Sequence, residues 1–176
     1  MESKSKICGV YPDIWILIAS LLERKDLSRL CRITKETHDL LLPLLYKNVV
    51  LHPEKDTKTL EMILKRPEIA DSIRSLRFYM PSLHLYQRRE QDLNITSLLH
   101  QAIHSMKNLK SLHGNRSFFT CKEQQRTFFE AIGKRENPLE EFTFTDGLSL
   151  ELFPSKKVAL PGLKKIVWDC DINDRA

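Results

Sequence analysis

The pattern of apolar residues near the start of the chain predicts three short helices. Pro12 suits a first helical turn, where its missing N–H is not needed, and residues 14–18 are all large and apolar. Five such residues in a row cover every face of a helix rather than one stripe. Asp26 is expected to cap a second helix and Thr34 a third, which Pro43 should end or kink.

This small helical module carries more large apolar side chains than it can bury. Three helices in about forty residues usually need a partner or a covalent staple to bury them all. The surplus apolar face of the first helix is therefore either a binding surface or a face that packs on the rest of the chain.

Beyond residue 48 the pattern changes to strands that alternate with helices. Residues 48–51 are expected to form a strand, and an apolar-x-x-apolar-x-apolar motif then recurs at uneven intervals. Gly114 stands at the third apolar position of the second copy. The four copies begin at Ile73, Leu109, Leu139 and Leu163. They resemble a degenerate leucine-rich repeat with long units.

Helices fit between these strands. Residues 56–57 can cap one helix, residues 98–106 carry the apolar face of another, and a Thr-Cys-Lys-Glu capping box at residues 120–123 can begin a third. Residues 80–92 are expected to form an exposed loop. Strands alternating with helices predict a mixed α/β fold, a short, irregular solenoid with parallel strands.

The strand period predicts which side chains of this array face a target. Leu76, Phe142 and Ile166 are expected to be buried, because they occupy the central apolar position of their motifs. The alternate positions should line the concave face. The residues predicted to bind a target are Arg77, Tyr79, His113, Thr143, Thr145 and Asp169. Ser111 and Val167 are expected in one row with Arg77 and Thr143, and the other four residues lie beyond that row.

The last strand motif ends at Trp168, close to the end of the chain. Each repeat of a solenoid buries its apolar side against the next, and a terminal repeat normally carries a cap. The array at residues 52–176 is therefore expected to be part of a longer array, or to have its end covered by a partner.

Composition narrows the classes of function. The 176 residues carry a net charge of +5, but no segment forms a basic arm, so nucleic acid is not an expected partner. No stretch approaches the roughly 20 apolar residues of a spanning helix, and no cleavable leader is recognisable, so a location inside the cell, in cytoplasm or nucleus, is expected. The four scattered cysteines predict free thiols.

The sequence offers no convincing catalytic or metal site. It lacks a glycine-rich phosphate loop, a nucleophile elbow and a zinc-protease motif. His100 and His104 share a helix face without a third ligand, Asp169 begins an incomplete calcium loop, and Cys31 with His38 lacks an oxyanion donor. We therefore expect no enzymatic activity, no cofactor and no metal.

The N-terminal series of residues resembles an F-box, in the form common in fungal proteins. The resemblance covers residues 10–51 and rests on an ordered series rather than on one residue. The matching residues are Pro12-Asp13-Ile14-Trp15, Ile18, Leu21-Leu22, Asp26-Leu27 and Leu30-Cys31-Arg32-Ile33-Thr34-Lys35, then His38-Asp39-Leu40, Pro43 and Leu45-Tyr46-Lys47-Asn48-Val49-Val50-Leu51.

This resemblance implies docking to the Skp-type adaptor of a cullin–RING ubiquitin ligase. Its apolar positions serve the module's core and the adaptor contact, without a division between the two roles. They are Pro12, Ile14, Trp15, Ile18, Leu22, Leu27, Leu30 and Ile33. The chain is then expected to be the substrate-recognition subunit of the ligase, and its repeats are expected to hold a protein target.

Two alternatives remain open. The first is an F-box scaffold that never joins a ligase. The second is a nucleic-acid-binding protein, since residues 27–37 faintly resemble a helix-turn-helix and the chain is basic. Leu40 and Leu41 would crowd a recognition helix that should present polar groups to bases.

Overall fold

The computed structural model describes residues 7, 9–53, 55–79, 89–115, 122–145 and 162–169. The chain divides into two compact units, Met1–Asn48 and Val49–Ala176. The sequence placed the boundary after Leu51, whereas the structure places it after Asn48. The strand that begins there joins the sheet of the second unit.

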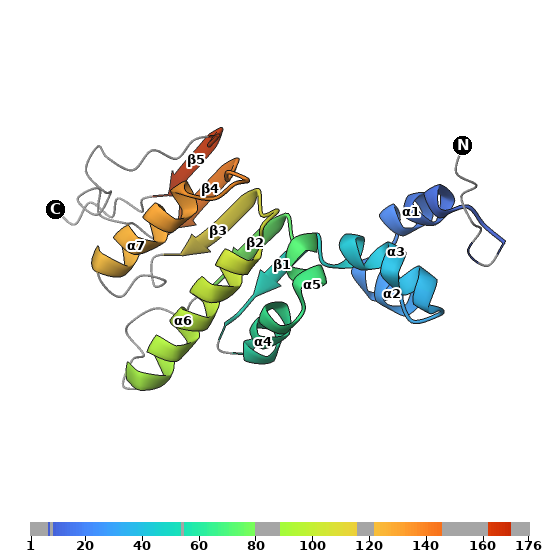
Figure 1. Ribbon diagram of the computed structural model, residues 1–176, viewed down its shortest axis with the longest axis horizontal. Coiled ribbons are helices and arrows are strands. Elements are labelled where there is room, and N and C mark those ends of the chain that lie inside the picture. Colours follow the sequence, from blue (N-terminus) through green and yellow to red (C-terminus); the bar gives the residue numbers. More distant parts are fainter. Residues whose placement is uncertain are drawn as a thin grey trace. The chain divides into compact units, whose positions relative to one another are not determined.

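The first unit consists of three helices, α1 (Pro12–Ser20), α2 (Arg24–Leu30) and α3 (Lys35–Leu45) (Figure 1). Glu23, rather than Asp26, is the N-cap residue of α2. Asp26 lies in the first turn and pairs with Arg29 at 3.0 Å, one turn further on. The core consists of Ala19, Leu27, Cys31 and Leu41, against which Trp15, Leu30, Leu40, Leu44 and Leu45 pack in part.

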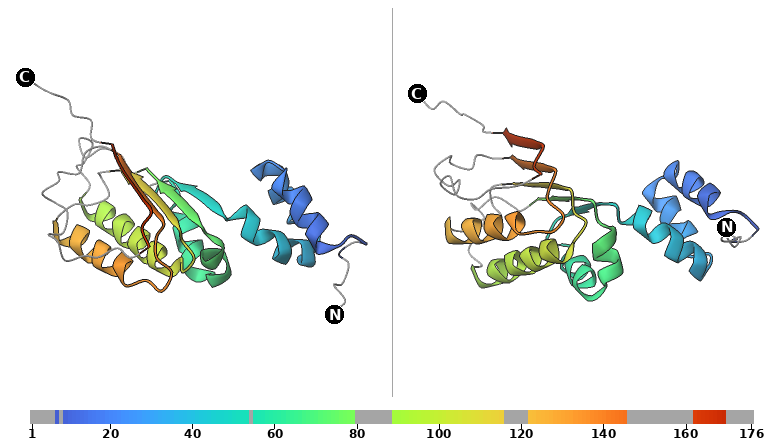
Figure 2. Two further views of the ribbon diagram at one scale, coloured as in Figure 1. Left: turned by 90° about the horizontal axis from the view of Figure 1, so that it is seen from above. Right: turned by 45° about the horizontal axis from the view of Figure 1, so that its top comes forward.

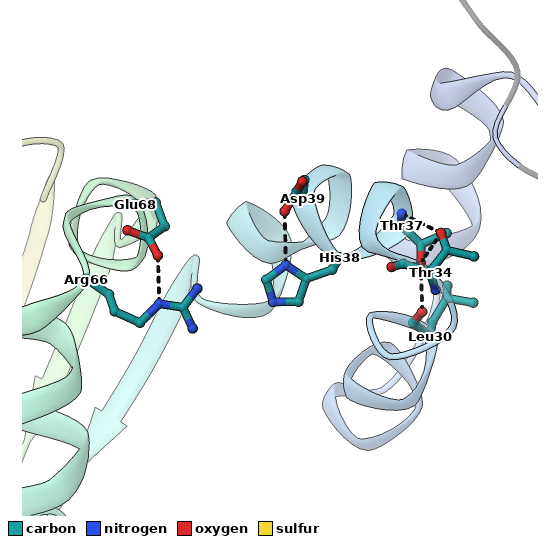
Figure 3. A network of polar contacts seen from close by, with 7 residues as sticks. All are labelled: Leu30, Thr34, Thr37, His38, Asp39, Arg66 and Glu68. Atoms are coloured by element: carbon teal, nitrogen blue, oxygen red, sulfur yellow. Dashed lines mark hydrogen bonds and ion pairs between the residues drawn. The ribbon is translucent and has the colours of Figure 1, made fainter.

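The start of α3 is fixed by a reciprocal pair of threonines (Figure 3). The Thr34 hydroxyl accepts the Thr37 N–H at 3.1 Å, and the Thr37 hydroxyl accepts the Thr34 N–H at 3.0 Å. Thr37 is buried and also donates to a backbone carbonyl. The helix then continues through Pro43 and ends at Leu45.

The second unit is built on a five-stranded sheet with the order β1-β2-β3-β4-β5. The strands from β2 to β5 pair in parallel. Their bounds are β1 (Asn48–Leu51), β2 (Ser75–Phe78), β3 (Ser111–Asn115), β4 (Glu141–Thr145) and β5 (Lys165–Asp169). The sequence predicted β1 separately, at residues 48–51, and the other four strands from the recurring apolar motif.

Four helices cover one face of this sheet (Figure 2). α4 packs against α6, and α6 packs against α7. The bounds are α4 (Thr57–Lys65), α5 (Pro67–Ser72), α6 (Arg89–Ser105) and α7 (Lys122–Gly133). The sequence did not predict α5, and α6 begins inside the segment predicted as a loop. The mixed α/β class and the parallel sheet are confirmed.

Burial along the strands follows the predicted alternation, with one exception. Leu76 and Phe142 are buried on the helix-covered face, whereas Arg77 is exposed. Ile166, also predicted to be buried, is 52% exposed. It is in register with Phe142, so it faces the same side, but β5 is the edge strand and lies beyond the sheet positions that α7 covers.

Consecutive strands are joined by a recurring backbone contact at their N-terminal ends. In each case one backbone carbonyl just before a strand accepts two successive N–H groups at the start of the next strand, at 2.8 and 3.0 Å. The three carbonyls belong to Arg74, Lys110 and Glu140, and the donors are Lys110 and Ser111, Glu140 and Glu141, and Lys164 and Lys165. The repeat inferred from sequence is thus a repeat of backbone geometry as well.

Charged side chains reinforce these junctions. The Glu140 carboxylate bridges Lys110 and Lys164 at 2.7 Å each, and these contacts lower the pKa of Glu140 to about 2. Arg135 donates to the carbonyls of Ile103 and Met106 at the end of α6. These carbonyls, which also accept the N–H groups of Met106 and Leu109, lie at and just after the end of α6, so Arg135 links this end to the connection that follows α7.

Candidate functional site

Two surfaces of the molecule are candidates for binding, one in each unit. The first is the apolar surface of the helical unit, which is made up of large apolar side chains that remain exposed. Leu21 is 81% exposed and Leu17 is 62% exposed. The apolar surface consists of Tyr11, Ile14, Ile16, Leu17, Ile18, Leu21, Leu22 and Ile33.

This apolar surface follows from the sequence of α1. The helix is apolar all round, but only Ala19 among its residues is buried. Trp15 is half-buried, packs on the core, and its indole N–H donates to the Ile7 carbonyl at 3.0 Å. The other large residues of the helix therefore remain outside. Such a patch usually marks a site of association, because burying one large apolar side chain is worth roughly 1.5–3 kcal/mol.

The structure divides the residues predicted to dock the adaptor. Ile14, Ile18, Leu22 and Ile33 are exposed and belong to the apolar surface. Pro12, Trp15 and Leu30 are half-buried. Leu27 is only 6% exposed and lies in the core, so within the predicted set it is a core residue of the module.

Leu17 and Leu21 are the two most exposed members of the apolar surface, yet neither was among the residues predicted to dock the adaptor. The predicted docking set instead includes Leu27, which builds the core. The all-round apolar pattern of residues 14–18 already contained the signal for Leu17.

The second candidate surface is the face of the sheet opposite the helices, which we call the open face. Register places Arg77, His113, Thr143 and Val167 side by side across β2 to β5. Thr145 and Asp169 form the next pair, and Tyr79 follows β2. The side chain of Asp169 lies outside the described residues. The row predicted from strand alternation is therefore present on the backbone, with one correction on β3. His113, rather than Ser111, stands beside Arg77 and Thr143, and Ser111 lies one step earlier, in register with Ser75 and Glu141.

A short polar network crosses the open face. Ser111 Oγ donates to Glu141 Oε2 at 3.1 Å and lies 2.7 Å from His113 Nε2. Because the single hydroxyl hydrogen goes to Glu141, the His113 N–H must donate to Ser111. Burial lowers the pKa of His113, and the nearby charges of Arg77 and Lys165 lower it further, against an opposing effect of Glu141.

These three groups do not make a nucleophilic triad. In such a triad the histidine lies between the nucleophile and the carboxylate, so that it removes the hydroxyl proton. Here the serine lies between the other two, and its proton points toward Glu141. The sequence missed this network, because Ser111 and Glu141 are 30 residues apart and only strand register brings them together.

A hollow of about 180 Å³ opens on the open face, at the C-terminal ends of the strands. This volume is below the roughly 300–1,000 Å³ of pockets that enclose drug-sized ligands, so the hollow suits a single side chain. Its lining combines a guanidinium, an imidazole, a phenol and two hydroxyls. The lining residues are Arg77, Phe78, Tyr79, His113, Gly114, Thr143 and Thr145.

The remaining chemical candidates fit structural roles. His100 packs against Phe128, and burial lowers its pKa to about 4. Cys31 is buried in the core of the first unit, and burial raises its pKa. Among the described residues, no group of three or more possible ligands lies close enough to hold a metal ion. None of the described helices combines the length and apolarity needed to cross a bilayer.

Comparison of the chain with protein-family models, curated proteins and solved structures finds no match.

Proposed function

We propose that the protein is the substrate-recognition subunit of an SCF-type ubiquitin ligase, with an F-box at residues 10–51 and a leucine-rich-repeat-like region after it. In this proposal the first unit docks a Skp-type adaptor and the second holds a protein target. The chain itself catalyses nothing, since ubiquitin transfer belongs to other subunits.

The observation that carries the proposal is the apolar surface of the first unit. A small helical unit that exposes Ile14, Leu17 and Leu21 has a surface suited to a protein partner rather than to water. The F-box-like order of residues suggests that this partner is a Skp-type adaptor. Burying a large aliphatic side chain at such an interface stabilises the complex by roughly 1.5–3 kcal/mol.

The second unit supports the other half of the proposal. Among the described residues, helices lie on one face of the parallel strands, and the open face carries mixed polar and aromatic side chains rather than uniformly apolar ones. Arrays of strand–helix repeats commonly bind proteins on such a surface.

The proposal is tested by co-expressing the tagged full chain with a Skp-type adaptor and a cullin. We expect both to co-purify with the wild-type chain. Leu17→Asp with Leu21→Asp should abolish their recovery, because two carboxylates would be buried without partners. Val50→Asp is the matched control, since it also places a charge on an exposed apolar residue, in the other unit.

The outcomes separate the candidate functions. Recovery of adaptor and cullin, lost only in the double variant, supports the ligase subunit. Recovery of the adaptor without the cullin indicates a ligase-independent scaffold. Equal recovery by the wild-type chain and a folded double variant would contradict docking through the apolar surface.

A further inference from the structure

The open face carries positive groups that no acidic side chain neutralises in the part of the chain that the structure describes. Arg77 and Lys165 lie on β2 and β5, and neither makes an ion pair there. Both act on His113, whose pKa they lower. The one described carboxylate among these groups, Glu141, accepts from Ser111. This face therefore favours a negatively charged partner.

The side chains that line the hollow indicate that the partner's negative group is a carboxylate. Arg77 offers a planar set of N–H donors that matches a carboxylate, and the hydroxyls of Thr143 and Thr145 can also donate. Next to them, Tyr79 stacks on His52 with ring centroids 5.4 Å apart. Val50 is exposed on the neighbouring strand. The hollow thus joins polar donors to an apolar and aromatic rim.

We propose that the open face binds an extended, acidic segment of the target protein, with one carboxylate side chain in the hollow between Arg77, His113 and Thr143. This inference rests on the proposed function, because it names the chemistry of the target that the second unit would hold. Lys165 attracts a further acidic residue of the same segment, and the rim formed by Val50 and Tyr79 takes an apolar one.

The dimensions of the sheet agree with an extended segment. Neighbouring strands are about 4.8 Å apart, so the three steps from β2 to β5 span roughly 14 Å. An extended chain rises about 3.3 Å per residue, and about five residues cover that distance. Alternate side chains of such a segment point to the same side, so glutamates at every second position would all face the sheet.

Binding should be linked to protonation of His113. Its Nε2–H already donates to Ser111, so Nδ1 is the nitrogen that takes up a proton. A bound carboxylate favours the charged imidazole and raises its pKa. The groups that face His113 are Arg77 on β2, Glu141 on β4 and Lys165 on β5. Affinity should therefore rise as the pH falls through the pKa of His113 in the complex.

The test uses the purified full chain without any adaptor. The probe is a fluorescein-labelled peptide of about eight residues in which serine and glutamate alternate, long enough to cross the sheet. Binding is measured by fluorescence anisotropy. The same peptide with glutamine in place of glutamate, a phosphoserine version and a single-stranded oligonucleotide of similar length are the comparisons.

We expect the glutamate peptide to bind, with affinity that falls as salt rises, and the glutamine peptide to bind at least about tenfold more weakly. Arg77→Glu should weaken binding by about tenfold or more, whereas Lys58→Glu, the same charge change on the exposed side of α4, should leave it unchanged. Histidine NMR signals, assigned with His113→Gln, should show that the peptide raises the pKa of His113.

Several results would overturn the inference. These are equal binding of the glutamate and glutamine peptides, unchanged binding in a folded Arg77→Glu variant, an unchanged His113 pKa, or binding confined to the phosphoserine peptide or the oligonucleotide. Adaptor binding is measured separately on the same preparations. Loss of peptide binding alone refutes the acidic target, and loss of adaptor binding alone refutes the ligase assignment.

Discussion

A single glycine shows how one position controls the packing of the second unit. Gly114 on β3 stands where the other repeats carry an apolar side chain. The Phe78 ring from the neighbouring strand lies over it, so a Cβ on Gly114 would lie 2.6 Å from Phe78 Cε2. Phe144 meets Phe78 edge-on, with ring centroids 6.4 Å apart. Two aromatic rings thus fill the space that a side chain would occupy.

This arrangement predicts the effect of Gly114→Ala. The added methyl group overlaps the Phe78 ring, and overpacking of this kind typically costs about 1–3 kcal/mol of unfolding free energy. Phe78→Leu on the same background should recover part of the loss. Urea unfolding of the two single variants and the double variant, followed by circular dichroism, measures the coupling. Additive losses would show that the ring and the glycine are independent.

The sequence located most strand side chains correctly, because alternation along a strand is a local property. Arg77, Tyr79 and Thr143 face away from the buried Leu76 and Phe142, as the pattern predicted. Ile166 is exposed against this prediction, because a side chain is buried only where another element covers it. A local sequence motif does not show that its strand lies at the edge of the sheet. The sequence could not show that Trp15 is a core residue rather than a contact residue. Its indole N–H donates to the Ile7 carbonyl, and the position of this carbonyl depends on the chain before α1.

At the scale of elements, the capping pair of α3 fixes where its helix begins. Thr34 was predicted as a cap from residue type and position. Its partner Thr37 was not, because Glu or Gln is the usual reciprocal residue of a capping box. Thr37 is fully buried, and its hydroxyl also donates to the Thr34 carbonyl at 2.9 Å.

Thr37→Val therefore removes several hydrogen bonds at once while it keeps the shape of the side chain. We expect a loss of about 1–3 kcal/mol in unfolding free energy, because the partly buried N–H of Thr34 loses its acceptor. Thr34→Ser retains the capping oxygen and should change stability by less than about 0.5 kcal/mol. Both are measured by urea unfolding. Equal stability of Thr37→Val and the wild-type chain would show that the pair does not hold α3.

Helix boundaries were predicted less well than the helices themselves. α2 begins before Asp26 and α6 begins at Arg89, because charged residues that resemble caps or loops also suit the first turn of a helix. The short helix α5 begins at Pro67, a residue type that can either end the preceding helix or occupy the first turn of a new one. Both interpretations of a proline are physically sound, so only the structure separates them.

At the scale of the whole molecule, the sequence predicted two parts, a helical module followed by strand–helix repeats. The structure contains two compact units in that order. Each unit has its own core and its own exposed surface, apolar in the first and polar in the second. This separation is what a receptor needs, because the residues that would bind an adaptor and those that would bind a target then do not compete for the same surface.

The exposed residues within the first unit could not be selected from sequence alone. A helix that is apolar all round gives no direction for its core. The small residue Ala19 and the half-buried Trp15 define the inner side, which leaves Leu17 and Leu21 outside. These two leucines are therefore the most informative positions for the central claim that the apolar surface docks a Skp-type adaptor.

The most direct test is calorimetric titration of the purified full chain with a purified Skp-type adaptor at several temperatures. The account predicts one-to-one binding with a negative heat-capacity change, since apolar area is buried. Leu17→Asp with Leu21→Asp should weaken it by at least about a hundredfold, because burying each leucine contributes roughly 1.5–3 kcal/mol. No binding by the wild-type chain, or wild-type affinity in the folded double variant, would contradict the account.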